Sequence, residues 1–347
     1  MHMADALINP AVGGTMWLVT AGLIAYCARK VKQTMNDRLV PMMGVLGAFI
    51  FAAMMINFSI PGTGSSGHLG GGLILTILLG PYAAFLVISS VLVVQAFFFA
   101  DGGLLALGCN IFNLGFFPAF IAYPFIYRVI ARDEYGTLRA WIAAIVAAVV
   151  GLQLGAFGVV LETKASGISE LPFSAFVLLM QPIHLAIGIV EGLATAAVVA
   201  FVAHARPEAL FPAQAVVEPR NSMRPVLIGL LIATVIVGGA ASWFASTHPD
   251  GLEWSIAKVS GKEEVSGTED NLHKGLGQLQ EKTAFLPDYG FKSTETEAAP
   301  AEQTAAEPEQ WPTISAGTSV SGIVGGLITL GLTVLIGFAL KARRAGV

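Results

Sequence analysis

Residues 173–203 read FSAFVLLMQPIHLAIGIVEGLATAAVVAFVA, an almost unbroken apolar run that contains one charged side chain, Glu191. An α-helix needs about 20 predominantly apolar residues to cross the hydrocarbon core of a bilayer, and this run is longer than that. Over the whole chain only 12% of the residues are charged and the mean hydropathy is +0.72, whereas about a quarter of the residues in an ordinary soluble domain are charged. The stretch therefore predicts a transmembrane helix in an integral membrane protein.

Eight further apolar stretches share this character. They comprise residues 12–28, 39–57, 69–79, 82–100, 104–127, 138–161, 226–244 and 320–340. Together the stretches predict an all-α integral membrane protein with about nine transmembrane helices. Residues 1–204 are expected to form a seven-helix bundle, residues 205–225 a cytoplasmic linker, and residues 226–347 a two-helix hairpin module with an outer loop at residues 246–319. Residues 293–310 of that loop are rich in glutamate and poor in large apolar side chains, which predicts disorder.

The distribution of lysine and arginine predicts which side of the membrane each loop faces. Cytoplasmic loops carry an excess of these residues. If the amino terminus lies outside, most of the 19 Lys and Arg residues fall on the cytoplasmic side, including those at residues 29–38 and 341–344. With nine crossings, the first residues of the chain and the loop around residue 68 then share the extracytoplasmic face.

The chain opens Met1-His2-Met3, and a second histidine, His68, lies in a glycine-rich segment at residues 60–72. The Met1 amine, the His2 peptide nitrogen and the His2 imidazole can form adjacent chelate rings around one metal ion, which leaves a fourth in-plane position for His68. Four nitrogens in a square suit Ni(II) or Cu(II). Residues 2–10 contain no Lys or Arg, so we expect no cleaved secretory signal. We expect Met1 to be retained because the next residue, His2, is bulky. The alternative is that the Met-His start has no function and that His68 is a mobile loop residue in water.

Polar side chains within transmembrane helices are costly and are candidates for function. Gln181, His184 and Glu191 recur at helical spacing and therefore lie on one face of their helix. One interpretation is that a set of polar residues orients the metal-binding histidines, and the equally weighted alternative is that the same set forms hydrogen bonds between helices. The set consists of Asn110, Asn113, Gln181 and His184. Glu191 lies deeper toward the cytoplasm and is interpreted as a possible coupling residue.

Two other functional classes fit part of this pattern. His184 and Glu191 could form the acid–base pair of a membrane-embedded enzyme, although no nucleophile accompanies them. Alternatively, Glu191 could carry a proton in a secondary transporter. The chain lacks a Gly-x-x-x-x-Gly-Lys-Ser/Thr phosphate-binding loop, so an ATP-driven process would need a separate ATPase subunit. We therefore expect a transport component that is not an enzyme, with a divalent metal ion as its cargo, no resident cofactor and no nucleic-acid partner.

Four segments together resemble one known family. They are residues 1–3 (MHM), 68–81 (HLGGGLILTILLGP), 106–115 (ALGCNIFNLG) and 181–192 (QPIHLAIGIVEG). Similar segments occur in CbiM and NikM, the substrate-binding membrane (S) components of nickel and cobalt energy-coupling-factor (ECF) transporters, and the resemblance covers about the first 204 residues. Residues 249–253 (PDGLE) resemble the small accessory component, NikN or CbiN, of the same systems, here fused in frame.

The resemblance implies a metal site formed by Met1, His2 and His68, the same donors that coordination chemistry indicates. It also implies an extracytoplasmic amino terminus in a prokaryotic plasma membrane and uptake of Ni(II) or Co(II). The implied partners are a transmembrane coupling (T) component and ATPase (A) subunits. Residues 4–8 (ADALI) depart from the family, in which many members have an acidic or proline residue followed by Gly-Phe. The choice between nickel and cobalt is left open by this departure.

Overall fold

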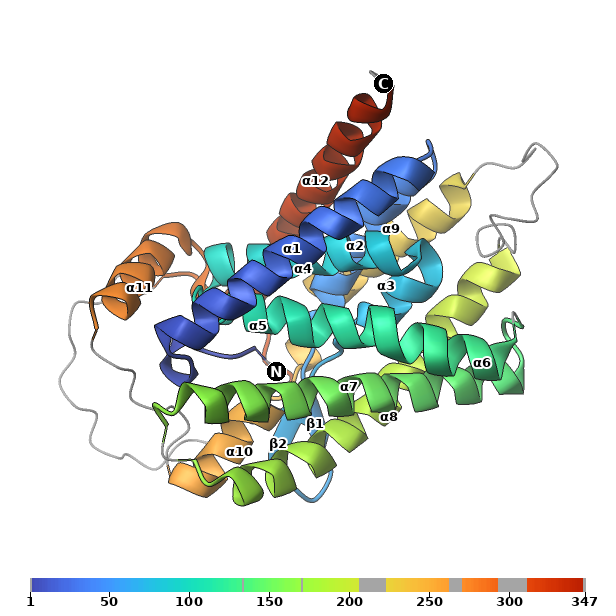
Figure 1. Cartoon of the computed structure of the whole chain (residues 1–347). Helices are drawn as coiled ribbons and strands as arrows, with labels where there is room; N and C mark the ends of the chain where they lie inside the picture. The colour runs from blue at the N-terminus through green and yellow to red at the C-terminus, as the bar shows by residue number, and fades with distance from the viewer. Residues whose placement is uncertain are drawn as a thin grey trace.

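The computed structural model of this 347-residue chain describes residues 2–132, 134–169, 171–205, 223–261, 270–292 and 311–345. These residues form a bundle of long helices with one short β-hairpin (Figure 1). The first described residues lie inside the bundle, whereas the end of the carboxyl-terminal helix, α12 (Ala316–Ala345), projects from it (Figure 1). The all-α membrane class that the composition predicts is confirmed.

In the part of the chain that the structure describes, six helices are long and apolar enough to cross a membrane. Five are continuous: α1 (Pro10–Thr34), α4 (Pro81–Phe99), α7 (Leu138–Ser166), α8 (Phe173–Ala205) and α12. The sixth consists of α5 (Leu107–Ile111), the π-helix η2 (Phe112–Tyr127) and α6 (Arg128–Ala131). Pro118 and Pro124, which have no amide hydrogen to donate, both lie in the π-helical part, where the regular α-helical pattern is interrupted.

Three of the predicted spans form shorter helices. α2 (Leu39–Met54) and α9 (Arg224–Gly239) have 16 residues each, and α3 (Gly72–Leu79) has 8 residues. Every predicted apolar segment therefore contains a helix, but only six helices within the described ranges have the length of a complete crossing. The count of nine transmembrane helices stays a prediction.

A β-hairpin that the sequence did not predict lies between α2 and α3. Its strands, β1 (Phe58–Ile60) and β2 (Ser65–Gly67), pair antiparallel with Phe58 opposite Gly67. Gly62 and Gly64 have φ angles of 77° and 75°, a left-handed conformation that glycine adopts without strain, and this allows the chain to turn between the strands. The hairpin ends directly before His68, so it fixes where this histidine emerges.

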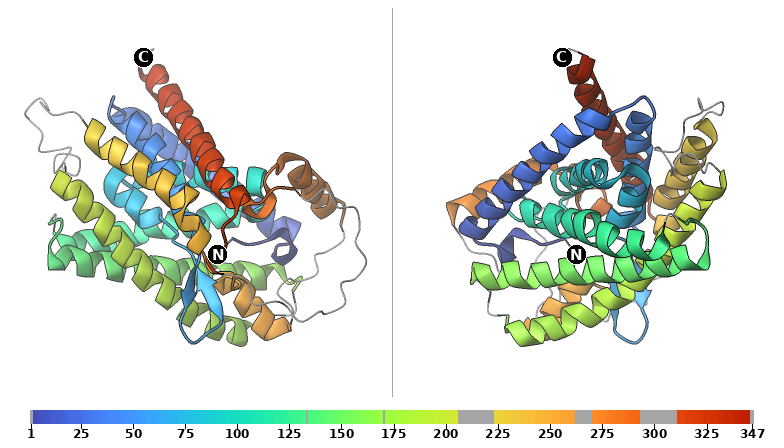
Figure 2. Two further views of the ribbon diagram at one scale, coloured as in Figure 1. Left: turned by 180° about the vertical axis from the view of Figure 1, so that it is seen from behind. Right: turned by 45° about the vertical axis from the view of Figure 1, so that its right-hand side comes forward.

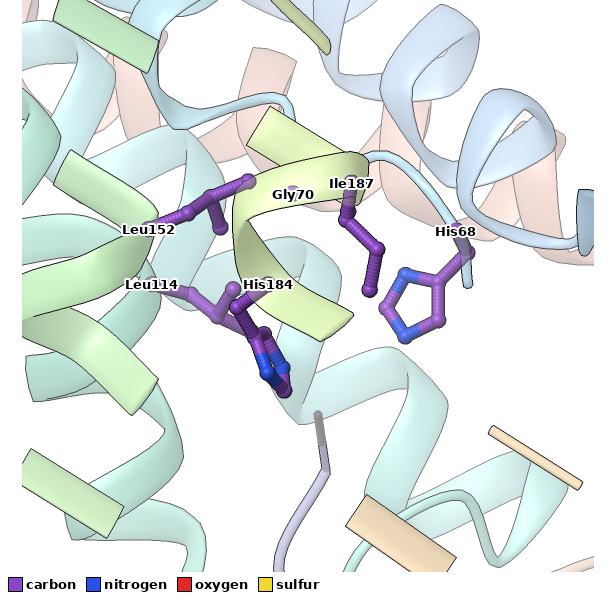
Figure 3. Close-up of a pocket in the computed structure, with 6 residues that line it drawn as sticks. All are labelled: His68, Gly70, Leu114, Leu152, His184 and Ile187. Atoms are coloured by element: carbon purple, nitrogen blue, oxygen red, sulfur yellow. The ribbon is translucent and has the colours of Figure 1, made fainter. Parts of the chain in front are cut away.

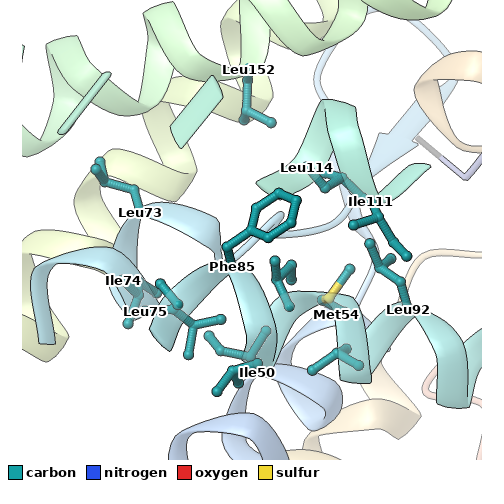
Figure 4. Close-up of a cluster of buried hydrophobic side chains, with 14 of the residues drawn as sticks. Ile50, Met54, Leu73, Ile74, Leu75, Phe85, Leu92, Ile111, Leu114 and Leu152 are labelled. Atoms are coloured by element: carbon teal, nitrogen blue, oxygen red, sulfur yellow. The ribbon is translucent and has the colours of Figure 1, made fainter. Parts of the chain in front are cut away.

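The core surrounds α4, which packs against α1, α2, α3, η2 and α12. Large apolar side chains meet there with almost no exposure, among them Ile50, Leu73, Phe85 and Ile111 (Figure 4). α7 and α8 run side by side along the opposite part of the bundle (Figure 2). Their close approach depends on glycine, since a Cβ on Gly188 would lie 2.7 Å from the Cα of Val149.

The carboxyl-terminal segments pack directly on the bundle. α9 and α12 both contact α2, and a Cβ on Gly322 would lie 2.3 Å from the carbonyl oxygen of Gly238. The shorter elements are the 3-10 helices η1 (Asp5–Leu7), η4 (Ala241–Phe244) and η5 (Pro287–Tyr289) and the helices α10 (Gly251–Ser260) and α11 (Asn271–Thr283). Most of the predicted linker at residues 205–225, and all of the tract at 293–310 for which disorder is predicted, lie outside the described residues.

Candidate metal centre

The first described residues are held by a buried asparagine on α5. The Met3 backbone N–H donates to Asn110 Oδ1 at 2.8 Å, and Asn110 Nδ2 donates to the Met3 carbonyl at 3.2 Å. The same carbonyl accepts a hydrogen bond from the Gly103 N–H at 2.9 Å. Asn110 thus fixes the amino-terminal backbone one residue after His2. Met1, the first of the predicted donors, lies outside the described residues.

A second link joins the amino-terminal segment to the loop after α4. The Asp5 carboxylate accepts hydrogen bonds from the N–H groups of Leu105 and Ala106 at 2.8 and 3.0 Å. Gly103 passes so close that a Cβ there would lie 1.9 Å from Asp5 Oδ1. Asp5 belongs to the segment that departs from the family pattern, and the sequence analysis did not single it out.

The imidazoles of His2 and His68 lie against each other. Their ring centroids are 5.0 Å apart and the ring planes differ by 4°. The His2 side chain is 6% exposed and His68 is 9% exposed, so both are buried. The structure therefore brings together the two histidines for which the sequence predicts a shared metal ion. The alternative interpretation, in which His68 is a mobile loop residue in water, does not fit its buried position against His2.

The tautomer of His68 follows from its hydrogen bond. Its Nδ1 lies 3.0 Å from the carbonyl oxygen of Leu69, which can only accept, so Nδ1 carries the hydrogen and Nε2 carries the lone pair. Burial is the main cause that lowers the pKa of His68 to about 3. The ring is therefore neutral over the physiological pH range, which is the form that binds a metal ion.

His2 contacts a carboxylate that the sequence analysis missed. Its Nδ1 lies 2.9 Å from Asp101 Oδ1, and Asp101 also accepts a hydrogen bond from the hydroxyl of Tyr289. Although burial opposes it, the adjacent His2 holds the pKa of Asp101 below the usual range for an aspartate. The sequence signal that could have identified Asp101 is its position as an acidic residue directly after the apolar stretch 82–100.

The orientation of the His2 ring matters for the predicted chelate. Only Nδ1 can close a small ring with the peptide nitrogen of the same residue, because Nε2 lies on the far side of the imidazole. In the structure Nδ1 faces Asp101, whereas Nε2 is buried and has no hydrogen-bond partner. Metal binding through the predicted donors therefore requires His2 Nδ1 to release Asp101.

His184 on α8 shares a small cavity with His68 (Figure 3). The lining residues are His68, Gly70, Leu114, Leu152, His184 and Ile187. His184 Nδ1 donates to the Met180 carbonyl at 2.8 Å, while its Nε2 is buried without a hydrogen-bond partner. The structure thus places His184 beside the candidate centre, but its hydrogen bond goes to its own helix.

Glu191 supports the chain just after His68. Its Oε2 accepts a hydrogen bond from the Gly70 N–H at 2.7 Å, and the side chain is 2% exposed. α3 begins at Gly72, so the carboxylate lies near the positive end of that helix. Because Glu191 binds Gly70 and His184 binds Met180, these two side chains do not form the hydrogen-bonded acid–base pair of the enzyme hypothesis.

Two other predicted residues form hydrogen bonds with partners other than the histidines. Asn113 Nδ2 donates to Glu162 at 2.7 Å, and Gln181 exchanges side-chain to backbone hydrogen bonds with Gln153 on α7. For these two residues the structure matches the interpretation as bonds between helices. Glu162 was missed because the predicted span at 138–161 ended one residue before it.

The PDGLE motif reaches the same region from the carboxyl-terminal segment. The Ser66 N–H on β2 donates to the Pro249 carbonyl at 2.8 Å, and the Ser66 hydroxyl donates to the His248 carbonyl at 2.7 Å. The Trp254 indole N–H donates to the Thr63 carbonyl at 3.0 Å. The motif therefore extends the edge of the hairpin that carries His68.

The same motif also packs on α8. Asp250 caps α10 by accepting from the N–H groups of Leu252 and Glu253, and Glu253 completes a capping box. A Cβ on Gly251 would lie 3.3 Å from His184 Cε1, so the start of α10 closes over this histidine. The view from behind in Figure 2 shows α10 next to the hairpin.

The donors available at this centre are limited. Within the described ranges no three His, Cys, Asp or Glu side chains converge in a way that could hold a metal ion. Two stacked imidazoles supply two nitrogens, so a complete four-nitrogen set here needs backbone nitrogens. The arrangement suits an ion that accepts mixed backbone and imidazole nitrogens.

Comparison with known families gives two matches. Residues 2–209 match CbiM, described as a cobalt uptake substrate-specific transmembrane region, and residues 224–342 match the PDGLE domain. The protein designated NikMN in Archaeoglobus fulgidus is 30% identical over 343 residues, which cover 98% of each chain. The fused nickel transport protein NikMN of Rhodobacter capsulatus is 31% identical over 310 residues, 83% of this chain and 88% of that one.

Among solved structures, the crystal structure of a transition metal transporter is similar, with a TM-score of 0.54 and 28% sequence identity. The match covers 62% of this chain and 98% of that one. The sequence similarity to the two NikMN proteins extends over both the bundle and the carboxyl-terminal segments.

Proposed function

This chain belongs to the CbiM family of substrate-specific transmembrane components, and from that premise we propose that it captures Ni(II) or Co(II) on the extracytoplasmic face and delivers the ion to an ATP-driven ECF uptake complex. It is a nickel or cobalt transport component of the CbiM/NikM type in a multi-pass membrane protein. The finer parts of the proposal concern the site, the ion and the partners.

The stacked, buried pair of His2 and His68 is the observation that carries the proposed site. The Met1 amine and the His2 peptide nitrogen would supply the remaining donors. Support comes from the Asn110 hydrogen bonds, which hold the backbone at Met3, and from the absence of a three-side-chain metal cluster among the described residues. Such a site would be destroyed by any extension of the amino terminus.

Geometry would provide the selectivity. A planar arrangement of four nitrogens penalises Mg(II), which demands octahedral oxygen ligands, and Zn(II), which is usually tetrahedral in proteins. The similar full-length proteins are designated nickel transporters, so nickel is the first ion to test. Affinity should fall as the pH is lowered, because the amine must lose its proton to bind the ion.

The proposed partners are a transmembrane coupling component and a pair of ATPase subunits. The chain itself has no phosphate-binding loop of the Walker type. Hydrolysis would therefore occur on a separate subunit, and metal release to the cytoplasm would depend on it.

The test is calorimetric titration of the full-length protein with native Met1, using Ni(II), Co(II), Cu(II) and Zn(II). We expect one tight equivalent of Ni(II) or Co(II), lost in His2→Ala, in His68→Ala and in a variant with one additional amino-terminal residue. Thr234→Val is the control, since it removes only a buried hydrogen bond from Thr234 to Leu230 within α9 and should bind as the parent does. Unchanged binding in the extended protein would disprove the proposed donors.

A further inference from the structure

The cavity between His68 and His184 contains a nitrogen donor that the proposed capture site does not use. His184 donates through Nδ1 to Met180, so Nε2 carries a lone pair, and this nitrogen is buried without a hydrogen-bond partner in a side chain that is 1% exposed. A buried polar atom without a partner is costly and calls for an explanation. His68, on the opposite side of the cavity, also has its lone pair on Nε2 (Figure 3).

The cavity has the size of a single small ligand. The volume that admits the centre of a water-sized sphere is about 10 Å³, close to the minimum that one water molecule requires. The remaining walls are Gly70, Leu114, Leu152 and Ile187, which offer no charged group. A substrate molecule of several atoms does not fit a volume of this size, which is of the order of one small ligand.

We propose that this cavity is a second, weaker site for the transported Ni(II) or Co(II), with His184 and His68 as its ligands. The inference rests on the proposed function, since it assigns the next position of an ion captured by His2 and His68. His68 lines both places, so it can remain bound while the ion exchanges the amino-terminal donors for His184. Imidazole nitrogen is a suitable ligand for nickel and cobalt.

Weak binding is what a transfer step requires. An ion must bind well enough to enter each site and weakly enough to leave it. The capture site would offer four nitrogens in adjacent chelate rings, whereas the cavity offers two imidazoles and no chelate. Gly70, which lines the cavity, donates its N–H to the Glu191 carboxylate. Glu191 follows His184 by seven residues on α8, or about 10 Å at 1.5 Å per residue.

The second site can be isolated by removing the first. Full-length His2→Ala protein in detergent is titrated with Co(II), followed by absorption spectroscopy, beside the parent and the double variant His2→Ala/His184→Ala. Because both sites use His68 Nε2, we expect the parent to bind one tight equivalent, His2→Ala to bind one weak equivalent, and the double variant to weaken it by about tenfold or more. His184→Gln in the same background tests the ligand role without leaving a large cavity.

The outcomes separate this inference from the proposed function. If the parent binds no ion tightly, the proposed function fails. If the parent binds tightly but His2→Ala shows no weak equivalent, or the weak equivalent is indifferent to His184→Ala and His184→Gln, the cavity holds only water and the inference is overturned. An anomalous scattering peak between His68 and His184 in His2→Ala crystals soaked with Ni(II) would support the inference. In cells that contain the ATPase partners, Thr234→Val is again the control, and it should support metal uptake while His184→Gln reduces it.

Discussion

Asn110 links a membrane helix to the backbone of the third residue. Its amide group donates and accepts, and Met3 presents one N–H and one carbonyl group to it. A hydrophobic residue at position 110 would leave the Met3 N–H unpaired in a buried environment. An unsatisfied buried group costs about 1–3 kcal/mol, which corresponds to about a 5-fold to 150-fold change in an equilibrium constant.

We therefore expect Asn110→Ala to weaken Ni(II) binding by about tenfold or more, measured by calorimetric titration of the protein with native Met1. The reason is that the amino-terminal donors lose their fixed position before the ion arrives. Thr20→Val is the matched control, because it removes the buried Thr20 hydrogen bond to Gly108 on the same short helix without touching the amino terminus. Equal losses in both variants would mean that Asn110 stabilises the bundle and does not position the metal donors.

For individual residues, the sequence was a better guide to which side chains could bind a metal ion than to which side chains contact one another. His2 and His68 could be selected because an amino-terminal Met-His and a second imidazole complete a nitrogen set for one metal ion, and His184 because polar side chains within transmembrane helices are rare. Asp5 and Asp101 were missed because their role depends on a loop that folds back over the amino terminus, and hydropathy contains no information about that path. The orientation of the His2 ring is likewise decided by Asp101, a neighbour in space that is far away in sequence.

Among the elements, the hairpin and α10 form one unit. β1 and β2 are three residues each, too short to be stable as an isolated pair, and the PDGLE motif supplies further hydrogen bonds at Ser66. The sequence could predict neither the strands nor this contact, because the glycines of residues 60–72 indicate only an irregular backbone. The capping box at Asp250, by contrast, depends on residues that are neighbours in the sequence, Asp250 and Glu253.

Gly251→Ala tests whether this unit positions His68. A Cβ at residue 251 would lie 2.6 Å from Ile183 Cγ2, and overpacking of this kind typically costs about 1–3 kcal/mol. We expect α10 to move away from the hairpin, with faster amide exchange at β2 and metal binding weakened by about fivefold or more.

Gly275→Ala is the control for that substitution. Gly275 lies on α11 with nothing within 4 Å of its Cβ position, so alanine there should leave exchange at β2 and metal affinity as in the parent. Normal metal binding by Gly251→Ala with displaced α10 would show that the hairpin holds His68 without help from the PDGLE motif.

α11 docks on the amino-terminal segment through His273. Its Nδ1 lies 2.8 Å from Asp270 Oδ2, and its Nε2 lies 3.2 and 3.0 Å from the carbonyl oxygens of Asp5 and Ile8. All these oxygens can act as acceptors, so the ring is fully satisfied only when both nitrogens are protonated. Although burial opposes it, the bonds to Asp270 and then to Ile8 raise the pKa of His273 above its ordinary value.

The sign of the resulting pH dependence follows from that direction. Because the pKa of His273 is raised, protonation of this ring stabilises α11 on the amino-terminal segment. This stabilisation is complete below the unfolded-state pKa of about 6.5 and is lost as the pH rises through the pKa of His273 in the folded protein. We expect amide exchange in α11, corrected for the intrinsic rate, to accelerate as the pH increases through this range. His273→Gln should abolish the dependence, and a slope that persists in that variant would assign it to another group.

For the molecule as a whole, the described residues separate the two ends of the bundle. His2, His68, α10 and Tyr289 gather in one region, whereas Lys341 near the end of α12 pairs with Asp37 in the loop after α1. From the distribution of lysine and arginine the sequence predicts that these two ends lie on opposite sides of the membrane. It could not predict how closely the carboxyl-terminal segments pack on the bundle, because such contacts depend on small residues such as Gly238 and Gly322 that approach only in the folded state.

The orientation in the membrane leads to a prediction that uses the two ends of α7. Lys164 and Arg139 are both exposed and lie near opposite ends of this helix, while Cys27 and Cys109 are buried and should react slowly. If the metal centre faces outward, Lys164→Cys should react with a membrane-impermeant maleimide in intact cells, and Arg139→Cys only after the membrane is opened. Each variant is the other's control, since both place a cysteine at an exposed position of the same helix. The reverse pattern would put His2 and His68 on the cytoplasmic side, where the centre could release an ion but could not capture one from outside.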